Sequence, residues 1–530
     1  RAGAAGGPGR AIAYAQGSNR LFVARSDEVS LDVIELEGGR RETVPLGNAR
    51  TGSFAAGATA LAVVPRTQFL YAAADGRIVV VETHGASPFA AIDASGDRLA
   101  VDGTADVLLV AGDGEASLIE TGRHALAWRL PGVMTGALLA FFLVLLARRL
   151  FASRALPALV GAVVLLDGST YAMPRIGMND VYVALFIVAG WYFVVAAHGP
   201  RRSWRADLVI AGICFGLAFA SKWAGLYALA GLLLGCLFVT GRALRRREPG
   251  RGGPLDLLAG RGRNAALLFA CFAIVPVALY LGSYLRWFGG PTVPYGWDQV
   301  ELTRQMLGYH SSLTAPHPAG SPWWSWPLVL KPVYWYYGQS AGGENAYLYD
   351  AGNLALYWSA LVATAWCAVT AVRVRSLRLG FVVFALAVQY VAWIPITRVL
   401  FFYHFFTALP FYLLALAVAL AVLWERRERA PVVALLGLAT FVAIFFYPFV
   451  SGLPVPASSA SMFFVLPTWQ YDCQFYPSDG GGLRCDLSGG SVDAAALLAR
   501  IALAGGLAVL AVAAGLALAR VPALRARLGR

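Results

Sequence analysis

The chain has 530 residues, 58% of them hydrophobic and 14% charged, and its mean hydropathy of +0.61 excludes a soluble globular protein. Its formal net charge of +13 comes from arginines that stand in short clusters between apolar runs. Because nucleic-acid binding needs a continuous basic face, these clusters indicate membrane topology and no nucleic-acid partner. We therefore predict a polytopic α-helical membrane protein.

The first region, residues 1–126, has no candidate membrane span and repeats a pattern of short β-rich runs. The paired runs are 21–24 with 31–35, 69–72 with 78–83, and 108–111 with 117–121. Runs joined by Asp-Gly turns predict hairpins, and a spacing of roughly 40 to 50 residues is that of propeller blades. Three units cannot close a ring, so we predict an all-β, propeller-like and truncated domain, with an open β-domain or a β-sandwich as the alternatives.

From about residue 127 apolar runs alternate with arginine clusters. About eleven runs are candidate transmembrane helices, some of them short for a span of roughly 20 residues. These runs are 131–147, 155–170, 180–198, 206–220, 223–240, 264–283, 351–373, 378–396, 400–424, 431–450 and 494–518. By the positive-inside rule the arginine clusters are cytoplasmic. Since the chain would then start outside, we also expect a further helix upstream of Arg1.

This topology divides the chain into four parts. The first half of the transmembrane core, 127–283, follows the β-domain, and an aromatic and proline-rich loop, 284–350, separates it from the C-terminal helices, 351–530. The β-domain, the aromatic loop and a second loop, 451–493, are predicted to be extracytoplasmic. Tryptophan and tyrosine prefer the level of the lipid headgroups, so we expect the aromatic loop to contact membrane lipids.

Several ionisable and polar side chains fall on this outer side, where charges at membrane depth are costly. They are Arg175, Asp180, Lys222, His310, Arg398, Tyr403 and His404. Each one alone could be an interfacial anchor or a member of a structural ion pair. Lys222 and Arg398 together would suit a phosphate. Asp180 could act as a base, orient a sugar hydroxyl or simply form an ion pair, and we predict Arg175 as its partner.

Several short motifs then follow one another in a specific order. The motifs are Trp128–Pro131, Ala147–Phe151, Arg175–Asp180, Ala220–Tyr227, Tyr309-His310, Ser321–Pro327, Gly352-Asn353, Arg398 with Phe402–His404, and Pro410. In this combination they resemble the bacterial relatives of the dolichyl-phosphate-mannose protein O-mannosyltransferases. The resemblance covers roughly residues 128–425.

The resemblance implies a GT-C type membrane glycosyltransferase in the bacterial plasma membrane, with its active site on the extracytoplasmic face. Its partners would be a polyprenyl-phosphate sugar donor, with mannose as the sugar, and a Ser/Thr hydroxyl of a protein or peptide. No cofactor and no metal is expected. The resemblance places Lys222 and Arg398 at the lipid phosphate and Asp180 in an acidic catalytic role near the sugar. Further binding candidates are Arg175, His310, Tyr403 and His404.

Two departures from the family pattern stand out. The family has an Asp-Glu pair in its first outer loop, whose aspartate is the proposed base, and no counterpart can be assigned in this chain. The family also reads Gly-Asn-Pro where this chain has Gly352-Asn353-Leu354, which puts the geometry of that turn in question.

Two cysteines and two alternative functions complete the predictions. Cys473 and Cys485 flank a glycine-rich segment and would form a disulfide if that segment faces an oxidising compartment.

A GT-C enzyme that acts on a glycolipid or cell-wall glycan remains an alternative function. A transporter or non-enzymatic binding protein is the other, although neither inverted repeats nor broken helices at mid-depth are evident.

Overall fold

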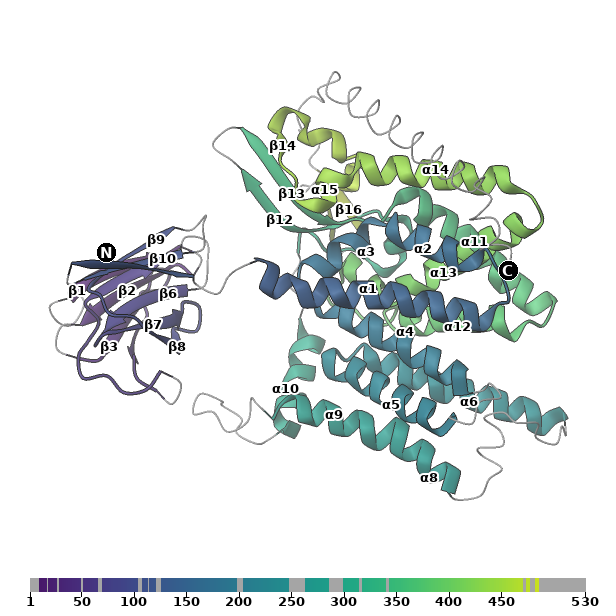
Figure 1. Cartoon of the computed structure of the whole chain (residues 1–530), viewed down its shortest axis with the longest axis horizontal. Coiled ribbons are helices and arrows are strands. Elements are labelled where there is room, and N and C mark those ends of the chain that lie inside the picture. The colour runs from purple at the N-terminus through teal and green to yellow at the C-terminus, as the bar shows by residue number, and fades with distance from the viewer. Residues whose placement is uncertain are drawn as a thin grey trace. The chain divides into compact units, whose positions relative to one another are not determined.

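The computed structural model describes residues 9–16, 18–25, 28–48, 51–64, 69–102, 107–112, 114–120, 125–197, 204–246, 263–285, 299–313, 317–339, 343–469, 473–476 and 482–485. These residues form two compact units, one that ends at Trp128 and one that starts at Arg129 (Figure 1). Each unit is described by itself.

The first unit consists of antiparallel sheets in which each strand pairs with its neighbour in sequence. Two sheets have four strands, ordered β1-β2-β3-β4 and β5-β6-β7-β8, and one has three, ordered β11-β10-β9. The strands are β1 Gly9–Ala15, β2 Arg20–Arg25, β3 Ser30–Glu35, β4 Arg41–Pro45, β5 Ala60–Val63, β6 Phe69–Ala74, β7 Arg77–Glu82, β8 Ser87–Asp93, β9 Arg98–Asp102, β10 Val107–Gly112 and β11 Glu115–Glu120. The three predicted hairpins are confirmed as β2-β3, β6-β7 and β10-β11.

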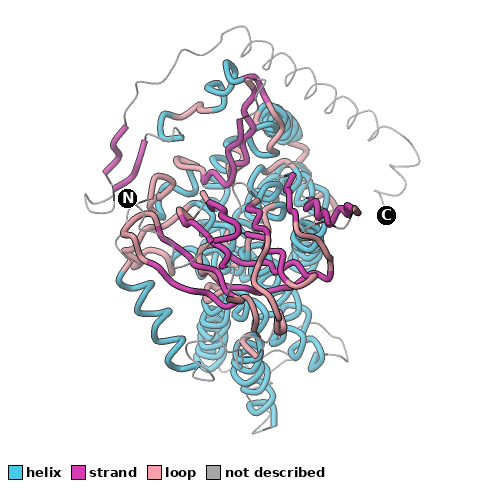
Figure 2. The backbone as a smooth tube through the Cα atoms, turned by 90° about the vertical axis from the view of Figure 1, so that its left-hand side faces the viewer, coloured by secondary structure: helices cyan, strands magenta, loops and turns pink. Residues whose placement is uncertain are grey.

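Alternation along the middle sheet explains how the sheets pack. Leu70 and Ala72 of β6 face a buried cluster shared with Phe22 of the first sheet, whereas Tyr71 faces a cluster shared with Leu108 of the third. Successive side chains of a strand point to opposite faces, so one sheet serves two cores. The sheets in the described residues do not form a closed ring, and a β-propeller as such is therefore not confirmed (Figure 2).

Helices dominate the second unit. They are α1 Ala125–Leu150, which begins in the first unit, α2 Leu156–Leu165, α3 Gly168–Ala172, η1 Met173–Arg175, α4 Asn179–Ala197, α5 Trp204–Ser221, α6 Gly225–Arg246, α8 Arg263–Phe269, η2 Ala270–Ile274, α9 Val275–Ser283, α10 Gln299–Ser312, η3 Trp323–Leu328, α11 Leu354–Arg373, α12 Leu377–Val391, η4 Phe402–Thr407, α13 Leu409–Glu425, α14 Arg429–Phe445, α15 Tyr447–Ser451, η5 Ala457–Phe463 and η6 Pro467–Trp469. Short strands β12 Val333–Gln339, β13 Glu344–Asp350 and β14 Val455–Pro456 form one sheet, and β15 Cys473–Tyr476 pairs with β16 Gly482–Cys485.

The number of membrane spans differs from the prediction. Within the described residues, five helices are long and apolar enough to cross a membrane, or six if the pair 156–165 and 168–175, bent by 72°, counts as one span. Four further apolar helices are shorter: Gly225–Leu237, Leu377–Val391, Leu409–Glu425 and Arg429–Phe445. The predicted run 494–518 lies outside the described residues. A count of eleven is therefore not confirmed.

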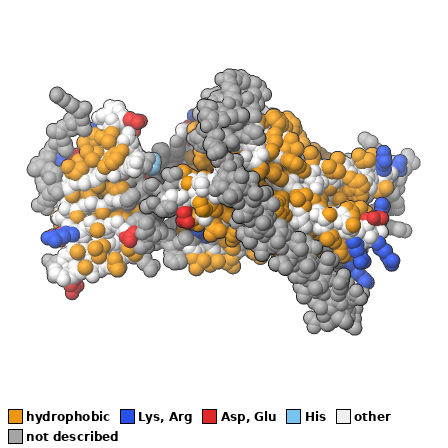
Figure 3. Space-filling view, turned by 90° about the horizontal axis from the view of Figure 1, so that it is seen from above, with side chains coloured by type: hydrophobic (Ala, Val, Ile, Leu, Met, Phe, Trp, Pro, Cys, Tyr) orange, Lys and Arg blue, Asp and Glu red, His pale blue; other side chains and the backbone are white. Residues whose placement is uncertain are grey.

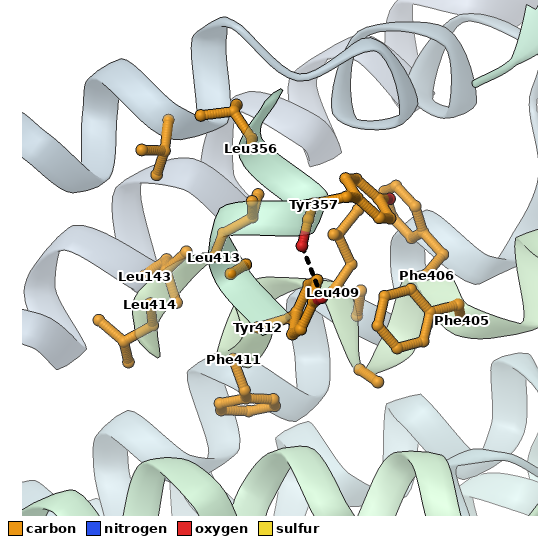
Figure 4. Packing of buried hydrophobic residues seen from close by; sticks show 14 of the residues in the cluster. Leu143, Leu356, Tyr357, Phe405, Phe406, Leu409, Phe411, Tyr412, Leu413 and Leu414 are labelled. Atoms are coloured by element: carbon orange, nitrogen blue, oxygen red, sulfur yellow. Dashed lines mark hydrogen bonds between the residues drawn. The ribbon is translucent and has the colours of Figure 1, made fainter. Parts of the chain in front are cut away.

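Helix α13 forms the centre of the second unit. Nearly every residue from Leu409 to Ala421 is buried, including Phe411 and Leu414 (Figure 4). The Tyr412 hydroxyl donates to the backbone carbonyl of Tyr357 in α11 at 2.7 Å, which satisfies its polar group inside an aromatic cluster. A helix that is apolar on all sides is enclosed by others, and α13 packs against α2, α11, α12 and α14.

The helix connections divide into two sets with different chemistry. Arginines stand at or beyond the ends of α1, α11 and α13, as Arg148, Arg373 and Arg426. On the face shown in Figure 3, basic side chains of the second unit gather at one end, while hydrophobic side chains cover its flank. The opposite end of α11 connects to the sheet of β12, β13 and β14, and that of α13 connects to η4; the candidate site lies beside these two connections.

Candidate active site

A tight turn between α5 and α6 positions Lys222. The amide of Lys222 donates to the Ala218 carbonyl at 3.1 Å, and the amide of Gly225 donates to the Lys222 carbonyl at 2.9 Å. A Cβ atom at Gly225 would clash with the backbone of Ala218, so only glycine permits this close return of the chain. The turn leaves the Lys222 side chain at the end of α5, directed toward the start of α4.

Lys222 and Asp180 form a two-pronged ion pair. Nζ of Lys222 lies 2.8 Å from Oδ1 and 2.9 Å from Oδ2 of Asp180. The Asp180 side chain is 1% exposed, whereas that of Lys222 is 28% exposed. Asp180 stands in the first turn of α4, where the helix dipole favours a carboxylate. The lysine therefore covers the buried carboxylate and is the member of the pair that a ligand would meet.

The prediction that Arg175 pairs with Asp180 is wrong. Arg175 donates from its guanidinium to the Ser451 carbonyl at 3.2 Å, and its charge lies 4.8 Å from the centre of the Tyr171 ring. Gly177, with φ of +70°, turns the chain between η1 and α4, so residues five apart in sequence need not face one another. Arg175 instead links η1 to α15.

Aromatic rings form the wall beside the ion pair. Nζ of Lys222 lies 5.2 Å from the centre of the Tyr403 ring, a cation–π distance. The Tyr403 ring stacks on Phe401 with 5.3 Å between centroids and lies 5.3 Å from Trp335 of β12. Two distant parts of the sequence, η4 and β12, therefore hold one side of the site.

His404 is enclosed below this wall. Its side chain is buried, its ring lies 4.3 Å from that of Trp393, and the Phe401 amide donates to Nδ1 at 2.9 Å. Nδ1 also lies 3.0 Å from the Phe401 carbonyl oxygen, so both backbone polar atoms of Phe401 contact this ring nitrogen. Packing of this kind positions Tyr403 and Phe401, and the predicted contact of His404 with substrate stays a prediction.

Arg398 contributes a second cation. It is half-buried, and its guanidinium donates to the neighbouring Val399 carbonyl at 3.4 Å. No carboxylate lies within ion-pair distance of Arg398 among the described residues. Burial and the charges of Arg398 and Lys222 lower the pKa of His310 on α10. His310 therefore lies in an electropositive region, since Asp180 offsets only one of the two cations.

Sequence reasoning missed a buried acidic group beside this region. Asp350, at the end of β13, is 1% exposed, and its Oδ1 has no hydrogen-bond partner. Burial raises the pKa of Asp350 to about 7, a hydrogen bond from Ser169 opposes the rise, and the charges of Asp167 and Asp180 add to it. With its pKa near 7, the Asp350 carboxyl holds a proton about half of the time at neutral pH. Its position two residues before the Gly352-Asn353 motif was the available signal.

The Gly352-Asn353 motif is a structural joint. Asn353 caps α11 by accepting from the amides of Ala355 and Leu356, and its side-chain nitrogen donates to the Leu166 and Ala439 carbonyls at 2.8 Å each. Its own amide donates to Asp167 at 3.0 Å.

Leu354 therefore stands at the first position of α11, where proline is favoured because the amide there has no helical partner. Leucine is compatible with the same geometry, which answers the question about this turn.

Two other features are not part of the cluster around Lys222 and Asp180. A cavity of about 190 Å³ is lined by residues of α2, α3, α14 and α15, including Asp167 and Asn353, and by none of the predicted site residues. Cys473 and Cys485 are direct partners in the backbone register of β15 and β16. Their side chains and residues 477–481 lie outside the described part of the structure, so the disulfide stays a prediction.

Comparisons with known proteins define the class. The structure of the Saccharomyces cerevisiae protein O-mannosyltransferase Pmt1-Pmt2 complex bound to its sugar donor matches with a TM-score of 0.55 and 12% identity over 68% of this chain and 84% of that chain. The fold is that of a membrane glycosyltransferase of the GT-C type.

Sequence comparisons narrow the class to a family. Residues 115–286 match the family of dolichyl-phosphate-mannose-protein mannosyltransferases, and residues 297–469 match the C-terminal four-helix membrane region of protein O-mannosyltransferases. Together the two matches cover more than half of the chain, which belongs to the protein O-mannosyltransferase family.

Relatives of known function agree with this family assignment. Polyprenol-phosphate-mannose–protein mannosyltransferase of Mycolicibacterium smegmatis is 26% identical over 412 residues, 66% of this chain and 78% of that protein. The proteins of the same name from Corynebacterium glutamicum and Mycobacterium tuberculosis are 25% and 24% identical over the same shares of both chains.

Proposed function

We propose that this chain transfers mannose from a polyprenyl-phosphate donor to a Ser or Thr hydroxyl of a protein. Membership of the family and the names of its relatives support this substrate pair. The observation that carries the proposal in this chain is the Lys222–Asp180 ion pair beside the Tyr403 ring, together with Arg398, whose charge and that of Lys222 both act on His310. With one carboxylate for two cations, these residues suit an anion.

Arg398 is the main phosphate ligand in this proposal. Its guanidinium has two nitrogen atoms that form parallel hydrogen bonds to phosphate oxygens, and no described carboxylate competes for them. Lys222 is already paired with Asp180, so it adds a charge while Asp180 keeps it in place. Departure of a lipid phosphate builds negative charge, and cations fixed in advance stabilise that charge without further rearrangement.

The reaction follows from this arrangement. The acceptor hydroxyl attacks the anomeric carbon with inversion, a carboxylate takes its proton, and the bond from that carbon to the phosphate oxygen breaks. Both carboxylate oxygens of Asp180 accept from Nζ of Lys222, so in this mechanism Asp180 orients the lysine near the sugar. The ring of Tyr403, beside Nζ of Lys222, offers a face for the sugar. We assign no proton acceptor among the described residues.

We also propose that the site faces the outside of a bacterial plasma membrane. Arginines mark the opposite helix ends, at Arg148, Arg373 and Arg426, and the positive-inside rule makes those ends cytoplasmic. Up to eleven spans and a propeller-like stacking of the three N-terminal sheets belong to this proposal. The shared cores on both faces of the middle sheet support such stacking.

The test is transfer by the purified full chain in lipid nanodiscs. Polyprenyl-phosphate mannose with a radiolabelled sugar is supplied with a peptide that carries one threonine, and a matched peptide with alanine in its place is the control. Labelling of the threonine peptide alone is expected, with release of the label by alkaline elimination. Labelling of a glycolipid or glycan acceptor in place of the peptide would overturn the assignment of a protein substrate.

A further inference from the structure

Strand β12 presents an open edge of a sheet. The sheet has the order β12-β13-β14, and β12 pairs with β13 from Val333 to Gln339. Within the described residues, no strand pairs with the other side of β12. Such an edge exposes alternate amide and carbonyl groups to any extended chain that approaches it.

The open edge begins beside the candidate active site. The register between β12 and β13 shifts between Tyr334 and Tyr336, so Trp335 is an extra residue in a bulge. A bulge redirects a side chain, and the Trp335 ring lies 5.3 Å from Tyr403, whose ring in turn lies 5.2 Å from Nζ of Lys222. The edge of β12 therefore runs from the side of the ion pair toward Gln339, where β12 ends.

Natural proteins usually protect an open edge, and beyond the bulge at Trp335 the rest of β12 has few of the usual protective devices. Charged side chains and prolines within the strand are the common devices, and the sequence VYWYYGQ contains neither. Tyr336 and Tyr337 are 54% and 50% exposed, which adds apolar surface along the edge. An edge kept open next to a site favours a binding role over a packing role.

We propose that β12 binds the acceptor polypeptide as an added strand and delivers its hydroxyl to the site. The proposal rests on the proposed function, because that function requires a protein substrate. Main-chain hydrogen bonds bind an extended segment largely independently of its side chains. This mode of binding suits an enzyme that modifies Ser and Thr in different sequences. The exposed tyrosines would cover the peptide, and Trp335 would separate the paired segment from the reacting hydroxyl.

The first experiment uses acceptor peptides with single N-methyl groups. Methylation removes one amide hydrogen, so only the amides that face β12 should matter, and these occur at every second residue. We expect the KM for peptide to rise about threefold to tenfold at alternate positions and to stay unchanged at the positions between, with an unchanged KM for the donor. Equal effects at neighbouring positions, or no effect at any, would overturn the added strand.

A second experiment does not depend on turnover. The photoreactive residue p-benzoylphenylalanine at Tyr336 should cross-link to the acceptor peptide, whereas the same residue at Tyr14, a tyrosine of strand β1 that is 48% exposed, should not. Cross-links from Tyr336 to a second copy of the chain, or none to the peptide, would contradict the proposal. Cross-linking without any sugar transfer would uphold the binding edge and count against the proposed function.

Discussion

Lys222 Nζ lies 2.8 Å and 2.9 Å from the two carboxylate oxygens of Asp180, and this contact joins the end of α5 to the beginning of α4. The two residues are 42 positions apart in the sequence. Asp180 is buried and Lys222 is partly exposed, so the two members of the pair should respond differently to substitution.

Lys222→Met should be more damaging to stability than Asp180→Asn. Loss of the lysine leaves a buried carboxylate without a counterion, which costs about 3 kcal/mol, whereas a lysine left alone reaches water. The double variant Asp180→Asn/Lys222→Met should recover part of the loss. Thermal unfolding in detergent, followed by tryptophan fluorescence, gives the double-mutant cycle. If the loss of unfolding free energy in the double variant equals the sum of the two single losses, the contact between Lys222 and Asp180 contributes nothing to stability.

Arg398→Gln should weaken the use of the donor. Loss of a charge-assisted contact to phosphate costs roughly 1.5 to 3 kcal/mol, or about ten- to a hundredfold in kcat/KM for the donor. The kcat/KM of Arg398→Lys for the donor should fall between those of the wild type and Arg398→Gln, because lysine keeps the charge but not the planar pair of donors. Arg378→Gln, an exposed arginine in the first turn of α12, is the matched control. A wild-type kcat/KM in a folded Arg398→Gln protein would remove Arg398 from the site.

Asn353→Ala should destabilise the fold by about 3 kcal/mol. The change removes the cap of α11 and leaves the buried carbonyls of Leu166 and Ala439 without their donor. Ser376→Ala is the control, because Ser376 caps α12 through one contact to the Leu379 amide and should cost only about 1 kcal/mol. Unfolding of both variants in the same detergent measures the difference. Equal losses would show that the contacts of Asn353 beyond the cap do not matter.

Stability should fall as the pH rises from about 4 to 7 because of Asp350. Its pKa is raised in the folded protein to about 7 from 3.8, so the folded state holds a proton that the unfolded state has released. More protons bound in the folded state mean a stabilising contribution below this range that is lost as the pH rises through it.

Asp350→Asn should therefore raise the apparent Tm at pH 8 and remove part of its pH dependence. Glu344→Gln, at the exposed start of the same strand, is the control. The same slope of Tm against pH in Asp350→Asn and the wild type would contradict the protonated state.

Cys473 and Cys485 should be joined in protein purified under oxidising conditions. Their direct opposition in β15 and β16 suits a cross-strand bond, and closure of this short loop should stabilise the segment by about 2 to 4 kcal/mol. Mass spectrometry of the unreduced protein decides the question. Two alkylatable thiols would rule the bond out.

The sequence predicted local features well and side-chain partners poorly. The three N-terminal hairpins were predictable because alternation and turn residues are local signals, and Asp75-Gly76 indeed adopts positive φ angles of 50° and 69°. Helix positions followed from apolar runs for the same reason. The partner of Asp180 was not predictable, since Arg175 is near it in sequence and Lys222 is near it only in space.

By itself, the sequence determined that this is a helical membrane protein of the protein O-mannosyltransferase family, because hydropathy and short motifs are properties of the chain. Only the tertiary structure decided that Lys222 pairs with Asp180, that Arg398 has no described carboxylate partner and that the edge of β12 starts beside them. Side-chain partners and open edges depend on which distant elements pack together, and burial decides which charges must be paired.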